Sequence, residues 1–188
     1  MDIIPEKTPV ELAPHSSDWS KKAAAEIARL RDVIGKDIVL SMHHVGSTAI
    51  PAILAKPTID LAAEVTDHAL LATRKERLEA LGYQWHGEFG LPGRRFLSLM
   101  GGSPRKRLFN LHCYETGSNS VRRHLAFRDY MRAHPDKAKA YEAEKLRAKA
   151  AQPDDTTAYS AEKGEWIKAA EAEALAWYNA IATRSPAP

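Results

Sequence analysis

Residues 43–65, HHVGSTAIPAILAKPTIDLAAEV, bring a Gly-Ser-Thr turn and an aspartate into one short and otherwise apolar stretch. A turn of this kind exposes backbone N–H groups and hydroxyls, which is a common way to bind phosphate. Asp60 lies on the next predicted strand, where a carboxylate needs a partner because an isolated buried charge is costly. Gly46, Ser47, Thr48 and Asp60 therefore indicate a site for a phosphorylated ligand, with Asp60 placed to hold Mg²⁺ against the phosphates.

Three further residues can serve the same site. Lys56 can neutralise phosphate charge, or it can simply pair with Asp60. His112, in the segment FNLHCYE, can bond Asp60, ligate the metal or act as a base if its strand lies beside the Asp60 strand. Arg95 belongs to an arginine-rich segment and can stabilise negative charge in a transition state. We expect these side chains to line one polar cleft at an edge of the sheet.

The composition sets limits on the class of protein. The chain has 188 residues, 44% hydrophobic and 27% charged, which is ordinary for a globular domain with a sizeable core. A formal charge of +3 is too small to indicate nucleic-acid binding, so the expected partner is a small molecule or a nucleotide. The single cysteine, Cys113, excludes an internal disulfide and a multi-cysteine zinc site.

The sequence also indicates a compartment. No apolar run approaches the roughly 20 residues that a membrane-spanning helix requires. Residues 1–19 lack the basic region and apolar core of a signal peptide. We therefore expect a cytoplasmic protein with no membrane association, and the sequence leaves its oligomeric state open.

Hydrophobic periodicity predicts a mixed α/β chain that positions these residues. We expect an edge strand at 9–14, strands at 38–45 and 58–65, and an antiparallel meander within 83–115. We expect helices from Ser17 to Gly35 and over 68–82, 119–134, 135–151 and 158–182. These elements predict a single domain over 1–188, with an α/β core at 9–115 and a C-terminal helical region at 119–182.

Arginines gather in the helix predicted at 119–134, and two interpretations of them stay open. The helical layer can close over the sheet and offer Arg128 and Lys145 to an anionic ligand. Alternatively, the basic residues of this layer form surface ion pairs with nearby aspartates and glutamates, as most surface charges do.

The sequence resembles the GrpB family, whose members belong to the DNA polymerase beta-like nucleotidyltransferase superfamily. The resemblance is carried by HHVGSTAIPAILAKPTIDL, by FNLHCYE, and by HLAFRDYMRAHPDKAKAYEAEKLRAK followed by Tyr159 and Lys163. It extends over nearly the whole chain, roughly Pro9 to Tyr178. It implies a nucleotidyltransferase-like mixed β-sheet flanked by helices, with a C-terminal helical layer and a Gly-Ser turn opposite an aspartate on the following strand.

The resemblance also implies roles for individual residues. Active nucleotidyltransferases use a Gly-Ser turn, a pair of carboxylates two residues apart, and often a third carboxylate on a later strand. Gly46 and Ser47 match the turn, and Asp60 matches the first carboxylate. Ala62 stands where the second carboxylate is expected, and His112 falls in the region of the third.

These matches give two main hypotheses. The first is Mg²⁺-dependent transfer of a nucleotidyl or phosphoryl group from a nucleoside triphosphate to a small acceptor, with Asp60 and His112 as catalytic residues. The alternative, which Ala62 favours, is a non-catalytic binder of a nucleotide or other phosphorylated ligand that has lost the second metal carboxylate. A helical interaction protein with a disused pocket is a third reading, and the inward pattern of Asp60, Lys56 and His112 argues against it.

Overall fold

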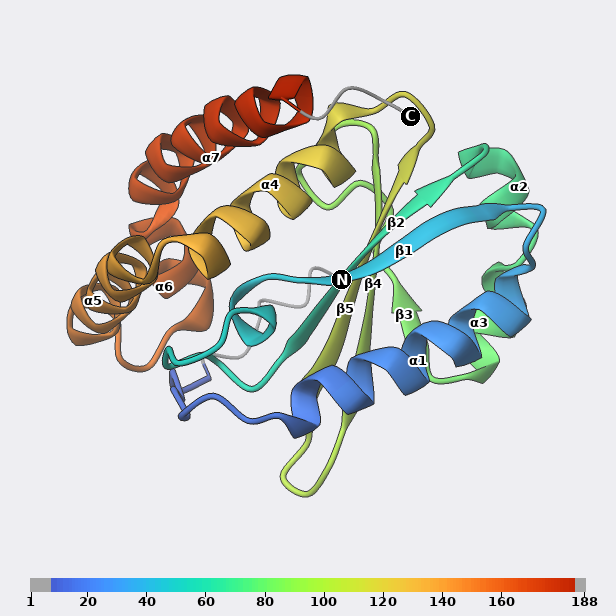
Figure 1. Ribbon diagram of the computed structural model, residues 1–188. Coiled ribbons are helices and arrows are strands. Elements are labelled where there is room, and N and C mark those ends of the chain that lie inside the picture. The colour runs from blue at the N-terminus through green and yellow to red at the C-terminus, as the bar shows by residue number, and fades with distance from the viewer. Residues whose placement is uncertain (1–7, 185–188) are drawn as a thin grey trace. The chain divides into compact units, whose positions relative to one another are not determined.

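The computed structural model describes residues 8–184 (Figure 1). The prediction that residues 1–19 hold no signal peptide therefore lies partly outside the described residues. The strands are β1 (Val39–Val45), β2 (Ile59–Val65), β3 (Tyr83–Trp85), β4 (Arg94–Gly101) and β5 (Lys106–Glu115), and a short 3₁₀ helix, η1 (Ser47–Ala49), follows β1. The helices are α1 (Asp18–Ile34), α2 (His68–Ala72), α3 (Lys75–Ala80), α4 (Asn119–Ala133), α5 (Pro135–Ala151), α6 (Thr156–Glu162) and α7 (Gly164–Arg184).

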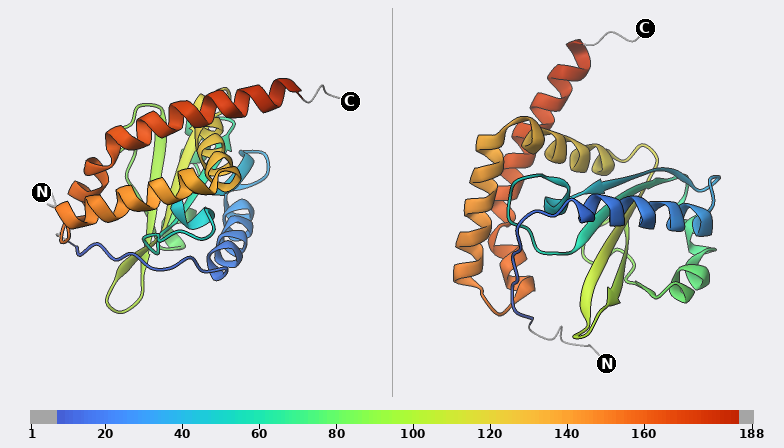
Figure 2. Two further views of the ribbon diagram at one scale, coloured as in Figure 1. Left: turned by 60° about the vertical axis from the view of Figure 1, so that its left-hand side comes forward. Right: turned by 60° about the horizontal axis from the view of Figure 1, so that its bottom comes forward.

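The strands form one mixed five-stranded sheet in the order β1-β2-β5-β4-β3. β1 is antiparallel to β2, β2 is parallel to β5, and β5, β4 and β3 form the antiparallel meander that the sequence predicts. A hairpin joins β4 to β5 and projects beyond the rest of the sheet (Figures 1 and 2). The expected fold class, a mixed β-sheet flanked by helices, is confirmed.

Helix α1 covers the apolar face of this sheet. Its buried side chains include Trp19, Ala23 and Leu30, and they share one side of the helix. Tyr83 of β3 donates a hydrogen bond of 2.7 Å from its hydroxyl to Glu26 of α1. Burial of the phenol raises the pKa of Tyr83, so this contact holds a neutral tyrosine against the helix.

The described chain divides into two compact units. The first, here called the sheet unit, comprises residues 16–49 and 57–125. The second, here called the helical unit, comprises 8–15, 50–56 and 126–184 of the described residues. The expected arrangement of a single domain, with boundaries at 9–115 and 119–182, stays a prediction.

The helical unit has a core of its own. Ile50 and Ile53, from the segment that precedes β2 in the chain, are buried with apolar side chains of α4, α5 and α7. Tyr141 of α5 stacks on Trp166 of α7 with ring centres 5.4 Å apart, and both helices can be followed in Figure 2. Lys145 of α5 is also buried in this unit.

Three predicted elements differ from the structure. The edge strand expected at 9–14 is reduced to one bridge between Ala13 and Ala55, because the prolines of this segment cannot donate to a ladder. The helix expected at 68–82 breaks into α2 and α3, where the Thr73 hydroxyl donates to the Leu70 carbonyl. The helix expected at 158–182 is interrupted before Gly164, a residue that disfavours helix interiors.

Candidate functional site

Polar side chains of three neighbouring strands share one face of the sheet, which we call the polar face. Asp60 pairs directly with Asn110, and two residues further along the strands Ala62 pairs with His112. Because directly paired residues point to the same side of a sheet, the prediction that Asp60 and His112 share a face is confirmed. The polar face consists of Asp60, Ala62 and Glu64 on β2, Asn110, His112 and Tyr114 on β5, and Arg94, Phe96 and Ser98 on β4.

Asp60 is held by two neighbours on β5. Its Oδ1 accepts a hydrogen bond of 2.8 Å from the Asn110 amide nitrogen, and His112 Nε2 lies 3.5 Å from the same oxygen. The Asp60 side chain remains 28% exposed, so solvent or a ligand can reach it. The side-chain amide oxygen of Asn110, Oδ1, is buried and has no hydrogen-bond partner among the described residues. It leaves an acceptor beside the Asp60 carboxylate.

Arg94 fixes the orientation of His112. The arginine is buried, and its Nη1 lies 3.4 Å from His112 Nδ1. A guanidinium can only donate, so Nδ1 must be the acceptor and the ring proton sits on Nε2, which faces Asp60. Desolvation lowers the pKa of Arg94, although the group stays a cation at neutral pH. Of the three roles that the sequence left open for His112, this arrangement matches the contact with Asp60, whose Oδ1 lies 3.5 Å from Nε2.

The Gly46 turn lies directly against the carboxylate. Gly46 has φ +72°, and its α-carbon is so close to Asp60 that a side-chain carbon there would lie 2.5 Å from Asp60 Oδ2. The Ala49 N–H donates to the Gly46 carbonyl at 3.1 Å and closes the turn. The Thr48 hydroxyl lies 2.9 Å from His44 Nε2 and is buried, so Thr48 ties the turn to β1, while Ser47 is half-buried.

Aromatic rings continue the polar face on both sides of His112. The His112 ring centre is 5.1 Å from Phe96 and 5.7 Å from His124, the latter in the first turns of α4. The Tyr114 hydroxyl lies 3.2 Å from His124 Nε2. Burial, followed by the nearby imidazole of His112, lowers the pKa of His124 to about 3, so His124 is neutral at physiological pH.

Two guanidinium groups lie near the Phe96 ring of the polar face. The guanidinium carbon of Arg94 lies 4.8 Å from the ring centre of Phe96, and that of Arg107 lies 5.9 Å from the same ring. Burial lowers the pKa of Arg107, and the charge of Asp60 opposes this effect. The charge of Arg107 therefore acts on the region around Asp60, and a half-buried guanidinium there suits an anionic ligand.

The donor set does not fit a resident magnesium ion. Mg²⁺ requires a nearly octahedral shell of oxygen ligands, usually with more than one carboxylate or phosphate. Ala62 occupies the position of the second carboxylate, and the paired His112 presents a proton rather than a lone pair toward Asp60. Within residues 8–184 there is no group of three or more His, Cys, Asp or Glu side chains that could hold a metal ion.

The placement of Arg95 on the polar face is wrong. Arg95 pairs with Cys113, whose side chain belongs to the opposite face, and its Nη1 donates to the Arg94 carbonyl at 3.1 Å. The Nη1 of Arg95 also lies 3.8 Å from Oε1 of Glu88. Side chains alternate between the two faces of a strand, so the neighbouring residue Arg94 lies on the polar face instead of Arg95.

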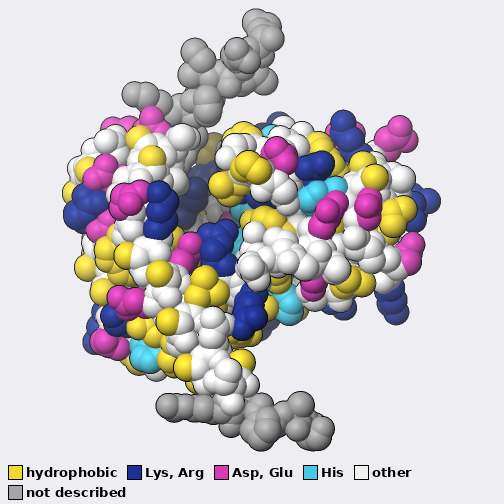
Figure 3. Space-filling model, turned by 90° about the horizontal axis from the view of Figure 1, so that it is seen from above, with side chains coloured by type: hydrophobic (Ala, Val, Ile, Leu, Met, Phe, Trp, Pro, Cys, Tyr) yellow, Lys and Arg dark blue, Asp and Glu magenta, His cyan; other side chains and the backbone are white. Residues whose placement is uncertain are grey.

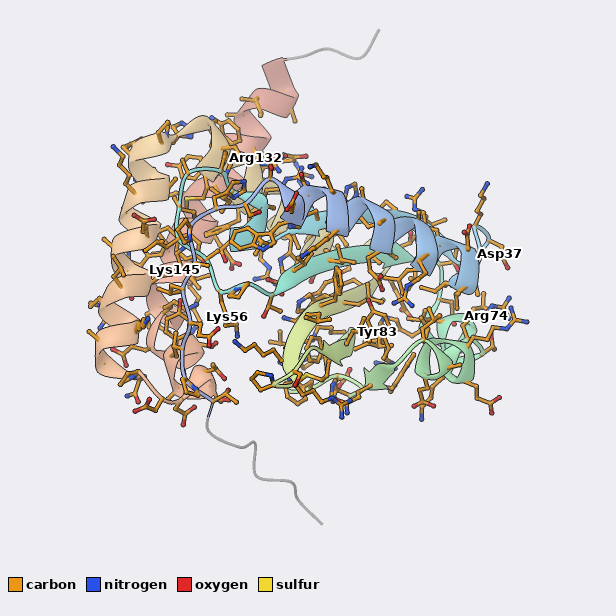
Figure 4. The ribbon with its side chains drawn as sticks, turned by 90° about the horizontal axis from the view of Figure 1, so that it is seen from below. Asp37, Lys56, Arg74, Tyr83, Arg132 and Lys145 are labelled. Atoms are coloured by element: carbon orange, nitrogen blue, oxygen red, sulfur yellow. The ribbon has the colours of Figure 1, made fainter. Side chains whose placement is uncertain are left out.

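Lys56, Arg128 and Lys145 belong to the helical unit. Lys145 donates from Nζ to the Leu54 carbonyl and lies 4.5 Å from the centre of the Tyr141 ring, and Figure 4 labels it on α5. Lys56 follows on the same segment as Leu54 and is half-buried. The Arg128 guanidinium forms two hydrogen bonds, of 2.7 and 3.1 Å, with its neighbour Asp129. A ligand role for these three residues stays a prediction.

Sequence reasoning missed three members of the polar face, all on β4. Arg94, Phe96 and Ser98 follow from the alternation of β4, but which set faces Asp60 depends on the register of β4 against β5. Alternation does place Asn110 on the face of His112, whereas its contact with Asp60 depends on the pairing of β5 with β2.

Over the outer surface that Figure 3 shows, acidic and basic side chains are interspersed. Within the described part of the chain, no helix is both long and apolar enough to cross a bilayer.

Comparisons with known proteins place the chain in a family. The family model of the GrpB protein matches residues 9–173. The UPF0157 protein YqkA of Bacillus subtilis is 41% identical over 171 residues, which cover 91% of this chain and 49% of YqkA. This chain thus spans about half the length of that relative.

Solved structures agree with this match. The crystal structure of the conserved protein GrpB from Enterococcus faecalis superimposes with a TM-score of 0.81 at 33% identity, covering 89% of this chain and 99% of that one. The Cid1 poly(U) polymerase with MgGTP bound is a more distant neighbour, with a TM-score of 0.46, 16% identity and coverage of 65% of this chain and 40% of that one. That likeness is too weak to carry a conclusion. The family match and the fold together show that this chain belongs to the GrpB family.

Proposed function

We propose that the polar face binds a nucleotide or another phosphorylated small molecule. The observation that carries this proposal is the half-buried guanidinium of Arg107, where the effect of burial on the pKa is opposed by the charge of Asp60, the carboxylate that contacts the Gly46 turn. Phosphate binding requires both positive charge and backbone donors, and a tight turn near a guanidinium group supplies the two together.

The two arginines contribute differently to such a site. Arg94 donates to the Glu88 and Phe89 carbonyls and lies against His112, so it acts mainly as a fixed charge. Arg107 is half-buried, and its side chain lies over the Phe96 ring. Its planar group is the better placed of the two to form paired hydrogen bonds with phosphate oxygens.

The buried side-chain amide oxygen of Asn110, Oδ1, supports the same proposal. A buried acceptor without a partner is costly, and a donor from a ligand would satisfy it. Beside Asp60, this acceptor suits a hydroxyl or amino group, such as a sugar hydroxyl or an acceptor nucleophile.

Transfer of a nucleotidyl or phosphoryl group is the second candidate. It is favoured by the contact between Asp60 and Gly46, which places a carboxylate immediately beside the turn that would hold the phosphates. The donor set of the chain does not fit a resident Mg²⁺, so any such ion would arrive with the nucleotide and keep phosphate oxygens and waters as its main ligands.

Thermal denaturation with phosphorylated probes tests the proposal. ATP, GTP, CTP, UTP and inorganic tripolyphosphate would be compared, each in EDTA and in excess Mg²⁺. A ligand that binds only the native state stabilises it by about 2.7 kcal/mol at 100 times its Kd, so we expect at least one probe to raise the melting temperature in EDTA. No rise with any probe would contradict the proposal.

A pair of variants locates the binding. Arg107→Gln should abolish most of the stabilisation by the effective probe. Arg105→Gln, two residues away and exposed on the β4–β5 hairpin, should leave it unchanged. A rise that requires Mg²⁺, together with product formation from a nucleoside triphosphate, would instead favour the transfer enzyme.

A further inference from the structure

An exposed aromatic ring stands beside the polar face. Phe89 lies in the loop 86–93 between β3 and β4, and 59% of its surface is exposed, the largest fraction among the large hydrophobic residues that are exposed in the described chain. Its backbone has φ +47°, a conformation that favours glycine. A bulky apolar residue that is both exposed and in a left-handed conformation is unexpected for a connecting loop, and such positions concentrate at functional sites.

Packing supports the ring from one side. The Phe89 ring is stacked on Phe96 with centres 5.2 Å apart and planes at 29°, and it also contacts His86 at 5.3 Å. Phe96 is a buried member of the polar face and is itself 5.1 Å from the His112 ring. Two ring-to-ring contacts therefore connect Phe89 to His112, and His112 contacts Asp60.

The backbone of the loop is held in place. Arg94 donates from Nη2 to the Phe89 carbonyl at 2.8 Å and from Nε to the Glu88 carbonyl at 3.2 Å. The Glu88 carboxylate accepts from the Gly93 N–H at 2.8 Å, which closes the loop on itself. The exposed ring is thus pre-organised, and pre-organisation lowers the entropic cost of binding.

We infer that Phe89 is a stacking platform for the base of a nucleotide whose phosphates lie toward the Gly46 turn. The inference rests on the proposed binding of a phosphorylated ligand and narrows that ligand to one with a planar ring. Phe96, on which Phe89 stacks, lies three strand spacings from β1 and two residues along the strands from the level of Asp60, so about 16 Å separates it from the end of β1. This span is comparable to the length of an extended nucleoside triphosphate.

Arg94 contacts both the Phe89 loop and His112. Arg94 holds the Phe89 loop through its carbonyls and also lies 3.4 Å from Nδ1 of His112. Aromatic stacking tolerates any base, because every base has a π-face. The platform therefore raises the affinity for nucleotides relative to phosphorylated molecules without a planar ring. It does not discriminate among the bases.

Variants of the loop test the platform. The dissociation constants of ATP and of inorganic tripolyphosphate would be measured by calorimetry for the wild type, Phe89→Ala, Phe89→Tyr and Leu91→Ala. We expect Phe89→Ala to weaken ATP binding about tenfold or more and to leave tripolyphosphate binding unchanged. Phe89→Tyr should keep the wild-type affinity, and Leu91→Ala, at an exposed apolar residue of the same loop, is the matched control.

The outcomes separate this inference from the function on which it rests. If tripolyphosphate binds the wild type as tightly as ATP does, phosphate binding stands and the stacking platform is wrong. If neither probe binds the wild type, both proposals fail. Equal losses of ATP affinity in Phe89→Ala and Leu91→Ala would also overturn the inference. A change in the sedimentation coefficient of Phe89→Ala, with ATP affinity unchanged, would overturn it in favour of a protein contact at this ring.

Discussion

Gly46 and Asp60 are in direct contact, with no room for a side chain between them. A side-chain carbon built on Gly46 would lie 2.5 Å from Asp60 Oδ2, closer than real contacts allow. Gly46 also adopts φ +72°, which L-residues with side chains rarely adopt. A side chain at position 46 would consequently have to displace Asp60.

Replacing Gly46 by alanine should therefore be more harmful than the backbone strain alone. We expect Gly46→Ala to lower the free energy of unfolding by about 2–3 kcal/mol, of which roughly 1 kcal/mol comes from the left-handed backbone and the rest from displacement of Asp60. Gly87→Ala is the matched control, because Gly87 has φ +65° and nothing within 4 Å of the added carbon. Urea denaturation measures both, and equal losses would show that the Asp60 contact is unimportant.

Asp60→Asn separates chemistry from structure. Its neighbours on β5 are the Asn110 amide, His112 and the half-buried guanidinium of Arg107. Because the Asp60 side chain is 28% exposed, solvent compensates part of the lost charge. We expect a stability loss of only about 1 kcal/mol. If the protein transfers a nucleotidyl or phosphoryl group, turnover should nevertheless disappear.

Glu64→Gln controls for the loss of a charge on the same strand and face. Glu64 lies four residues from Asp60 and accepts a hydrogen bond of 3.1 Å from Thr116. Activity and urea denaturation would be measured on both variants. A stability loss of 3 kcal/mol or more in Asp60→Asn, with ligand affinity reduced only in proportion, would assign Asp60 a structural role.

The stability of the sheet unit should depend on pH through His124. Its pKa falls from 6.5 to about 3, first because of burial, so the unfolded chain takes up a proton below pH 6.5 that the folded chain refuses until about pH 3. Stability from this residue is complete above pH 6.5 and declines as the pH falls toward 3, by at most about 1.4 kcal/mol per pH unit. His124→Gln should flatten this decline in urea denaturation between pH 7 and pH 4. An unchanged slope would mean that His124 is not the group that resists protonation.

At alkaline pH, the free energy of unfolding should depend on pH through Lys145. Burial lowers the pKa of Lys145 from 10.5 to about 7, so between these values the unfolded chain holds a proton that the folded chain has released. Stability should then rise as the pH increases from 7 to 10.5, by at most about 1.4 kcal/mol per pH unit.

Lys145→Met should remove this rise while filling a similar volume. It also leaves the Leu54 carbonyl without its Lys145 donor, so a constant loss independent of pH is expected as well. Lys139→Met, at an exposed lysine of the same helix, is the control. Denaturation at pH 7, 8 and 9 gives the slopes, and parallel curves for wild type and Lys145→Met would contradict the prediction.

The sequence by itself determined the local elements and the polarity of the site. Alternation with period two in FNLHCYE and TIDLAAEV was enough to put His112 and Asp60 each on a polar strand face. The left-handed glycine and the short segment between the strands likewise follow from residue types, because turn chemistry depends on the backbone of a few neighbouring residues. Local signals of this kind do not require knowledge of the partner strand.

Only the tertiary structure decided which arginine reaches the site and which lysine is buried. Arg94 and Arg95 are adjacent, and a shift of one residue in the pairing with β5 would exchange their faces. Lys145 looks like a surface residue of an ordinary helix, yet the Leu54 carbonyl and the Tyr141 ring surround its amine. Both outcomes depend on contacts between residues far apart in the chain, and the energy of a charge is set by such contacts rather than by its neighbours in sequence.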